Sequence, residues 1–309
     1  MKDIDVNCNR TALWSAALIV GWLAITVLTL VTTAQAANMA DLAWNQSNIS
    51  TLKKLDRREV ADLIDSIANP QVAPPIASSS IGTFTWNDLA GDGTYQLVMT
   101  VDVGRHFYNA LVIYNRDANG KMSAQEIRGW EIGPLSDVIR DLNGDGKKEL
   151  IIPSQLPCST YRGAGAAPTW PAVYRLENGH YIEASREFSN FYLNDVLPKL
   201  DRRINEARSE QAQAWLIMER DKILRVINRN PAAGLQQAYQ WMKSGDPELR
   251  ADAAVVFGDI GGHDEELKAL GSDENLNVAL AAKFAMRHKP GSFERWNQGS
   301  YQTIVNTPH

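Results

Sequence analysis

Oxygen-bearing side chains alternate along residues 141–149, in a pattern that suits a hard cation. Counting from residue 141, positions 1, 3, 5 and 9 carry Asp141, Asn143, Asp145 and Glu149. Ca²⁺ takes about six to eight oxygen ligands, and a tight loop with alternating oxygens supplies several of them. The main-chain carbonyl of Lys147, at position 7, adds another. The sequence therefore predicts a Ca²⁺ site in this segment, named here the Asp141 loop (residues 141–149), with these five residues as ligands.

The residues that follow the Asp141 loop exclude an EF-hand. Gly146, at position 6, allows the sharp turn that a calcium loop needs. An EF-hand also needs a bidentate acid at position 12, where this chain has Ile152. The run from Leu150 to Ile152, closed by Pro153, is typical of a short buried strand rather than a helix. We therefore expect a loop that joins two strands.

An earlier segment, named here the Asp88 loop (residues 88–96), matches the Asp141 loop at an offset of 53 residues. Ala90 removes the oxygen at position 3, and Gln96 removes the charge at position 9. Calcium affinity depends on the charge of the ligands, and Asp also favours turns without metal. The sequence therefore predicts a degenerate second site, for which an acidic turn without metal is the favoured interpretation; its candidate ligands are Asp88, Asp92, Thr94 and Gln96.

The match between the two copies continues beyond the loops. In each copy strand-like runs flank the loop, and two later runs are joined by Asn-Gly, at Asn119-Gly120 and at Asn178-Gly179. Asn-Gly between two such runs is a strong hairpin signal. Residues 76–185 are therefore predicted to form two copies of a four-stranded antiparallel unit.

The pattern Asp-Leu-Asn-Gly-Asp-Gly-x-x-Glu-Leu in the Asp141 loop resembles the calcium loop of FG-GAP/VCBS-type repeats, the blades of integrin-α-like β-propellers. The resemblance covers roughly residues 80–185. It implies propeller-blade-like units with Ca²⁺ in their loops, although the Asp88 loop departs from the family pattern at Ala90 and Gln96. A closed propeller needs more blades than these two.

Residues 186–309 are predicted to be helical. One long helix is expected over residues 201–228 and another from Asn230 to Ser244. Asp246–Ala254 aligns with Asp273–Ala281 at an offset of 27 residues, and the first of these segments resembles a HEAT-like repeat. Solenoids of this kind need about three repeats to be stable alone, so the resemblance implies packing against the β domain or against the helix expected over residues 201–228. The expected core positions of the long helix are Ile204, Trp215, Leu216, Ile223, Leu224 and Ile227.

The N-terminal residues 1–36 are predicted to direct export. Residues 11–33 carry no charge and Ala34-Gln35-Ala36 is a small-x-small cleavage site, so a cleaved signal is favoured over a membrane anchor. Residues 37–75 are expected to hold one helix, from Ser50 or Thr51 to Asn69-Pro70, and a proline linker. The domains are therefore expected in the bacterial periplasm, with anchoring to the inner membrane through residues 11–33 as the alternative.

Composition and motifs argue against several function classes. The formal net charge of −5 disfavours nucleic-acid binding. Neither Gly-x-Ser-x-Gly nor His-Glu-x-x-His occurs, and no catalytic residue is predicted. With Cys8 in the targeting segment, Cys158 has no partner for an internal disulfide. The long segment 153–169 keeps an envelope hydrolase as an alternative, in which His106, His180 and Cys158 would converge on a pocket.

The expected fold class is α+β and multidomain. An antiparallel β domain of two four-stranded, propeller-blade-like repeats (76–185) precedes an α-helical, HEAT-like domain (186–309). Because both modules resemble recognition scaffolds, the expected function is non-catalytic binding of a protein or glycan partner, with Ca²⁺ as cofactor. A structural component of an envelope homo-oligomer is a further alternative, which predicts an exposed apolar edge.

Overall fold

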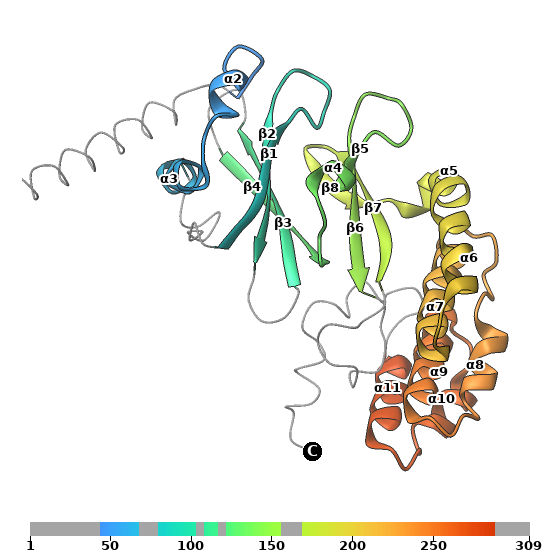
Figure 1. Ribbon diagram of the computed structural model, residues 1–309. Coiled ribbons are helices and arrows are strands. Elements are labelled where there is room, and N and C mark those ends of the chain that lie inside the picture. The colour runs from blue at the N-terminus through green and yellow to red at the C-terminus, as the bar shows by residue number, and fades with distance from the viewer. Residues whose placement is uncertain (1–43, 68–79, 103–107, 117–121, 156–168, 288–309) are drawn as a thin grey trace, which may run out of the picture.

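The computed structural model describes residues 44–67, 80–102, 108–116, 122–155 and 169–287 (Figure 1). Within these residues the chain is α+β, with two four-stranded antiparallel sheets followed by a run of helices. The predictions for the export segment, the proline linker and the first Asn-Gly turn fall outside the described residues.

Each sheet is a meander, in which every strand pairs with its neighbour in sequence. The first sheet contains β1 (Ile81–Asn87), β2 (Gln96–Asp102), β3 (Tyr108–Arg116) and β4 (Met122–Trp130). The second contains β5 (Ile139–Arg140), β6 (Glu149–Gln155), β7 (Thr169–Glu177) and β8 (His180–Glu183). The β7–β8 turn is the predicted Asn-Gly turn, with φ of 51° at Asn178 and 80° at Gly179, as a type I′ turn requires. Two four-stranded antiparallel units are thus confirmed.

Strand β6 runs through Pro153, where the sequence predicted its end. Pro153 faces Pro171 of β7 in the register. The short outer strand β5 pairs only with Glu149 and Leu150. Beyond Leu150, β6 is therefore an edge on its outer side, where a proline removes no ladder hydrogen bond.

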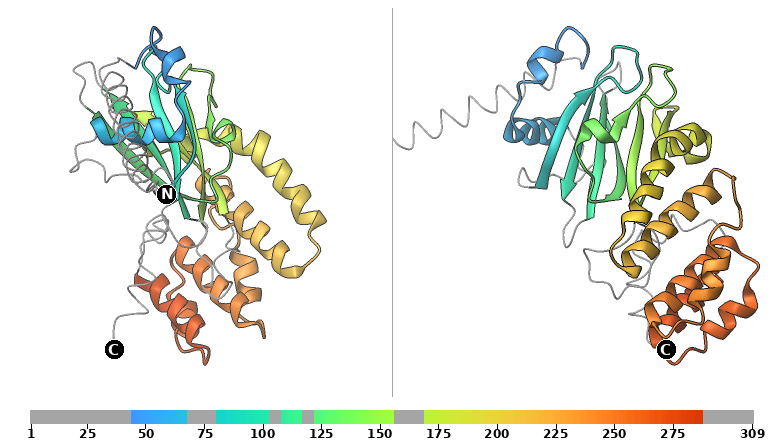
Figure 2. Two further views of the ribbon diagram at one scale, coloured as in Figure 1. Left: turned by 60° about the vertical axis from the view of Figure 1, so that its left-hand side comes forward. Right: turned by 45° about the vertical axis from the view of Figure 1, so that its right-hand side comes forward.

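The molecule is built in layers, as Figures 1 and 2 show. The short helix α2 (Ile49–Leu52) and α3 (Arg57–Ile67) cover one face of the first sheet, and the second sheet packs on its other face. Alternation along β2 explains both contacts, because Leu97 and Met99 join the core under the helices while Val98 joins the core between the sheets. The helical segments within residues 185–226 pack on the second sheet, and the helices within residues 235–287 pack on one another beyond them. Helices thus cover both outer faces of the two-sheet stack.

The core between the sheets combines apolar side chains with one polar clamp. Leu111 and Ile113 of the first sheet meet Ile152 of the second, and α4 (Leu135–Val138) packs beside them. Gln125 of β4 donates to the carbonyl of Tyr181 and accepts from its amide, both at 2.7 Å. This side chain therefore hydrogen-bonds to β8 as a neighbouring strand would, and it fixes how the two sheets lie against each other.

The sequence predicted a single helix from Ser50 or Thr51 to Asn69. This prediction is wrong, because the structure has two helices there, α2 and α3. The Asp56 carboxylate accepts from the amides of Arg58 at 2.8 Å and Glu59 at 2.9 Å. The Glu59 carboxylate in turn accepts from the Asp56 amide at 2.8 Å. This capping box starts a new helix at Arg57 and separates it from α2.

The helical part begins with a distorted segment and continues as pairs of helices. The segment contains a 3₁₀ turn η2 (Ser185–Phe188), α5 (Ser189–Phe191) and a π-helix η3 (Tyr192–Val196). The remaining helices are α6 (Leu197–Glu206), α7 (Glu210–Val226), α8 (Leu235–Trp241), α9 (Pro247–Ile260), α10 (Asp264–Leu270) and α11 (Leu276–Arg287).

The long helix predicted over residues 201–228 is also two helices, α6 and α7. The hydroxyl of Ser209 accepts from the amide of Ala212 at 3.2 Å and caps the start of α7. Three of the predicted core residues, Ile204, Ile223 and Ile227, are buried. The other three are partly buried: Trp215, Leu216 and Leu224.

The next helix starts later than predicted, at Leu235 rather than near Asn230. Gly234 has φ of 87°, a left-handed value that ends the preceding turns and interrupts any helix from Asn230. Helix α9 begins where the sequence predicted, since the Asp246 carboxylate accepts from the Glu248 amide at 2.9 Å.

The two segments aligned at an offset of 27 residues contact each other through a side chain. The guanidinium of Arg250 donates to both carboxylate oxygens of Asp273, at 2.7 and 3.0 Å. The two segments differ in burial, however, because Leu249 is 8% exposed whereas its counterpart Leu276 is 65% exposed. Asn277 stands where Arg250 stands in the first segment, and its side-chain amide donates locally to the side chain of Asn275 at 3.1 Å.

Candidate functional site

The Asp141 loop joins β5 to β6 and is shaped by its first carboxylate. Asp141 accepts from the amide of Gly144 at 2.6 Å and from that of Gly146 at 3.0 Å. Both glycines have left-handed backbones, with φ of 78° and 86°. A residue with a side chain would be strained at either position, so these glycines let the loop wrap around the Asp141 carboxylate.

The middle of the loop presents two exposed polar side chains. Asn143 accepts from the amide of Asp145 at 3.0 Å, and its own side-chain amide lies 3.2 Å from an Asp145 oxygen. The other Asp145 oxygen accepts from the amide of Lys147 at 2.8 Å. Each side chain thus stabilises the turn and keeps unused lone pairs for a ligand.

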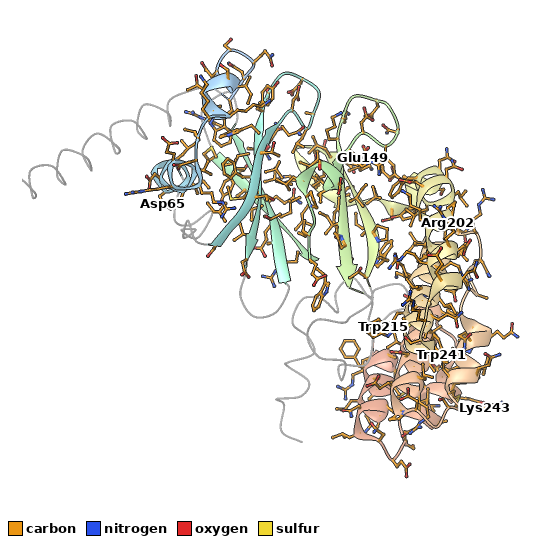
Figure 3. The ribbon with its side chains drawn as sticks, in the orientation of Figure 1. Asp65, Glu149, Arg202, Trp215, Trp241 and Lys243 are labelled. Atoms are coloured by element: carbon orange, nitrogen blue, oxygen red, sulfur yellow. The ribbon has the colours of Figure 1, made fainter. Side chains whose placement is uncertain are left out.

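Glu149 differs from the other candidate ligands because it is 2% exposed (Figure 3). Its carboxylate accepts from the amide of Leu142 at 2.8 Å and so closes the loop. Burial raises the pKa of Glu149; the amide of Leu142 opposes this, and the carboxylates of Asp145 and Asp141 raise the pKa further. The predicted ligands therefore share a negative potential that a bound cation would neutralise.

The pKa of Asp141 is shifted in the opposite direction, to a lower value. Burial acts to raise its pKa, but the amides of Gly144 and Gly146 and the ammonium of Lys148 outweigh it, so the pKa lies below its ordinary value. Lys148 Nζ is 3.9 Å from the Asp141 carboxylate. Asp141 is therefore ionised at neutral pH, as a metal ligand must be.

The donor set fits Ca²⁺ by its chemistry. Its side-chain donors are all oxygen, and carboxylates dominate it. In the structure, however, the described part of the chain holds no group of three His, Cys, Asp or Glu side chains placed to share a metal ion. Coordination would therefore require these side chains to move toward a common centre and to bind the ion through the lone pairs that the loop amides leave unused.

The Asp88 loop is held by a similar set of internal hydrogen bonds, but Asp88 accepts from the amide of Asp92 where Asp141 accepts from that of Gly144. Asp88 accepts from the amides of Asp92 at 3.1 Å and Gly93 at 2.9 Å, and Asp92 accepts from that of Thr94 at 2.8 Å. Gln96 accepts from the amide of Leu89 at 2.9 Å, as Glu149 does from that of Leu142. The residue at position 9 thus closes both loops, and it needs no charge to do so.

The two loops lie against each other at one end of the sheet stack, a contact that the sequence reasoning missed (Figure 1). The amide of Lys148 donates to the carbonyl of Leu89 at 2.9 Å. A Cβ atom added to Gly91 would lie 2.8 Å from the carbonyl oxygen of Gly146. Gly91 therefore allows both a left-handed turn and the close approach of the second loop, and this glycine was the sequence signal for the contact.

A cavity of about 280 Å³ lies beside the Asp141 loop. Four predicted ligands line it, and Arg175 of β7 faces them. Arg175 pairs with Glu177 at 2.8 Å and with Glu187 at 3.1 Å. A ligand bound here would meet both the loop oxygens and this ion-pair cluster; the four loop residues are Asn143, Asp145, Lys147 and Glu149.

The residues considered for a hydrolase do not form a described site. His180 is exposed on β8, while His106, Cys158 and most of the segment 153–169 lie outside the described residues. The tryptophans at the sheet edges, Trp86, Trp130 and Trp170, are 3%, 5% and 3% exposed and serve the core.

Comparisons with protein-family models, with curated proteins and with solved structures found no match. In the part of the chain that the structure describes, no helix combines the length and the apolarity that crossing a bilayer requires. Residues 11–33 lie outside that part.

Proposed function

We propose that the protein is an exported, non-catalytic recognition scaffold whose β domain binds Ca²⁺ through the Asp141 loop. In this proposal the two β units are FG-GAP/VCBS-type blades and the helical pairs are HEAT-like repeats. Ca²⁺ supplies fixed positive charge that stabilises the loop, and protein oxygens hold it there.

The negative potential in the Asp141 loop is the observation that carries the proposal. Three carboxylates from one short segment interact strongly enough for Asp141 and Asp145 to raise the pKa of the buried Glu149. In the Asp88 loop the equivalent buried side chain is the neutral Gln96, which makes the same hydrogen bond. The fold therefore does not require a charge at this position, so the acid at Glu149 has another purpose, for which cation binding is the best candidate.

Recognition would take place at the exposed tip of the loop. Asn143 and Asp145 are exposed, and they share a cavity with Arg175 and Glu187. Both charge signs and hydrogen-bonding groups are present there, which suits a polar protein segment or a glycan. Within the described residues, helices pack on both outer faces of the sheet stack, so the loop tip is the more accessible part of the β domain.

Calorimetric titration of the full-length protein with Ca²⁺ tests this function. We expect one ion to bind, and we expect binding to be lost in Asp145→Ala and retained in the matched variant Asp92→Ala. Chelator should lower the melting temperature of the wild type and leave that of Asp145→Ala unchanged. No heat of binding, or equal losses in the two variants, would overturn the proposal.

A further inference from the structure

A second cavity, named here the η3 cleft, lies where the second sheet meets η3, α6 and α7. It encloses about 240 Å³. Phe191 and Leu200 contribute apolar walls, and six charged side chains surround them. These residues come from elements that are distant in sequence, so no motif in the chain indicated this cleft. It is separate from the Asp141 loop, and none of the predicted site residues lines it.

The charged side chains of the η3 cleft differ in how far they are exposed to solvent. The side chains of Lys199 and Arg203 are 63% and 61% exposed, and that of Arg140 is 45% exposed. Two of the acids are more buried, with Asp195 at 30% and Glu219 at 14%, whereas the third, Asp137, is exposed. A molecule that enters from solvent therefore meets three cations and one acid first.

Asp195 holds two of these cations in place. Arg140 Nη1 lies 3.2 Å from one Asp195 oxygen, and Lys199 Nζ donates to the other. The Arg140 guanidinium also lies over the Phe191 ring, 5.6 Å from its centre. Hydrogen bonds from Lys199 and Arg140 overcome the effect of burial and lower the pKa of Asp195, so this acid stays ionised. Asp195 belongs to the π-helix η3, a rare distortion that is frequent at functional sites.

The third cation has a weaker partner. Arg203 Nη1 lies 3.7 Å from a Glu219 oxygen. Burial raises the pKa of Glu219 to about 7, and Arg203 only partly opposes this. Near neutral pH Glu219 is therefore protonated in about half of the molecules, and Arg203 then lacks a charged partner in the cleft.

The charge balance of the cleft then favours a negative ligand. With Glu219 neutral, the three cations face only the carboxylates of Asp195 and Asp137, which leaves one excess positive charge. The cavity is smaller than the roughly 300–1,000 Å³ of drug-sized pockets, so it suits a small molecule.

We propose that the η3 cleft binds a small organic carboxylate, whose anionic group contacts Arg203 and whose apolar body packs on Phe191 and Leu200. Protonation of Glu219 frees Arg203, so binding tightens as the pH falls. Because the competent fraction falls about tenfold between pH 6 and pH 8 for a group with a pKa near 7, the apparent affinity should fall by about the same factor.

Fluorine NMR with 4-fluorobenzoate and full-length protein tests this site, since line broadening of the ligand detects weak binding. The neutral isostere 4-fluorobenzyl alcohol is the control for charge. Arg203→Gln should weaken 4-fluorobenzoate binding about tenfold. The matched variant Arg202→Gln changes an exposed neighbour on the outer side of α6 and should have no effect (Figure 3).

The role of Glu219 has its own test. Glu219→Gln should bind 4-fluorobenzoate at about pH 8 as tightly as the wild type does at about pH 6, and its affinity should not vary across this range. The pH series on the unmodified protein needs no variant. The proposal is overturned if the alcohol binds as well as the carboxylate, if Arg203→Gln and Arg202→Gln behave alike, or if wild-type affinity is independent of pH.

Discussion

The two β units contact each other, and so do the two aligned helical segments, but through different chemical groups. In the β part the loops meet through main chain, with the Lys148 amide on the Leu89 carbonyl and Gly91 close to the Gly146 carbonyl. In the helical part the contact is a side chain, since Arg250 donates twice to Asp273.

This difference goes together with how closely the two copies in each part match. Main-chain contacts survive side-chain changes, so the Asp88 loop keeps its shape although Gln96 stands in place of an acid. A side-chain contact disappears with its residue, as at Asn277, which occupies the position of Arg250. There the leucine of the repeat, Leu276, is exposed instead of buried. The two copies therefore match more closely where the backbone carries the contact.

The largest effect is expected where the helical repeats are joined by one side chain. Arg250→Ala should lower the free energy of unfolding by about 3 kcal/mol, because it leaves the Asp273 carboxylate, in a pair only 15% and 12% exposed, without its partner. Urea unfolding measures this. The control Arg287→Ala removes an exposed arginine of α11 and should cost less than about 0.5 kcal/mol. Equal losses would contradict the assigned role of Arg250.

A smaller effect is expected from a methyl group placed between the loops. Gly91→Ala and Gly144→Ala are equivalent positions, and both have left-handed backbones, so each should cost about 1 kcal/mol. Only Gly91 also meets the neighbouring loop, so its variant should cost about 1 kcal/mol more. Thermal melting compares the pair, and indistinguishable variants would show that the loops do not touch in solution.

The smallest effect is expected from the charge at position 9. In chelator at about pH 7, Glu149→Gln should raise the free energy of unfolding by about 1 kcal/mol, since glutamine keeps the hydrogen bond and removes a buried charge. The reciprocal variant Gln96→Glu should lower it by a similar amount.

The raised pKa of Glu149 determines how the stability difference between Glu149→Gln and the wild type changes with pH. Because the folded-state pKa of Glu149 is raised, folding favours its protonated form, and the stability from protonation is lost as the pH rises through that pKa. The advantage of Glu149→Gln should therefore grow with rising pH and vanish below the ordinary glutamate value of 4.5. Stability curves of both proteins in chelator check this, and a constant difference would contradict it.

Local patterns in the sequence predicted the β part well. The matching loops and the Asn178-Gly179 turn each depend on a few neighbouring residues, so strand order and both acidic loops could be found. Two helix starts were missed although local signals for them exist: Asp56 and Glu59 have capping-box spacing before Arg57, and Ser209 caps the start of α7.

Other features depend on residues that are far apart in sequence. Pro153 lies inside a strand because β5 is short, and this could not be known from the residues around the proline. The η3 cleft joins Arg140 to Asp195 and Arg203 to Glu219 through tertiary packing, and its value as a site depends on the burial of Glu219. Burial and pairing of this kind are consequences of the fold, not of local spacing.

Amide hydrogen exchange by NMR, in Ca²⁺ and in chelator, tests the central claim most directly because it locates the ion. We predict that Ca²⁺ slows exchange at the loop amides Gly144, Gly146 and Lys147, and leaves their counterparts Gly91, Gly93 and Thr94 unchanged. Unchanged exchange in the Asp141 loop, or equal slowing in both loops, would contradict a single calcium site built on the acid at position 9.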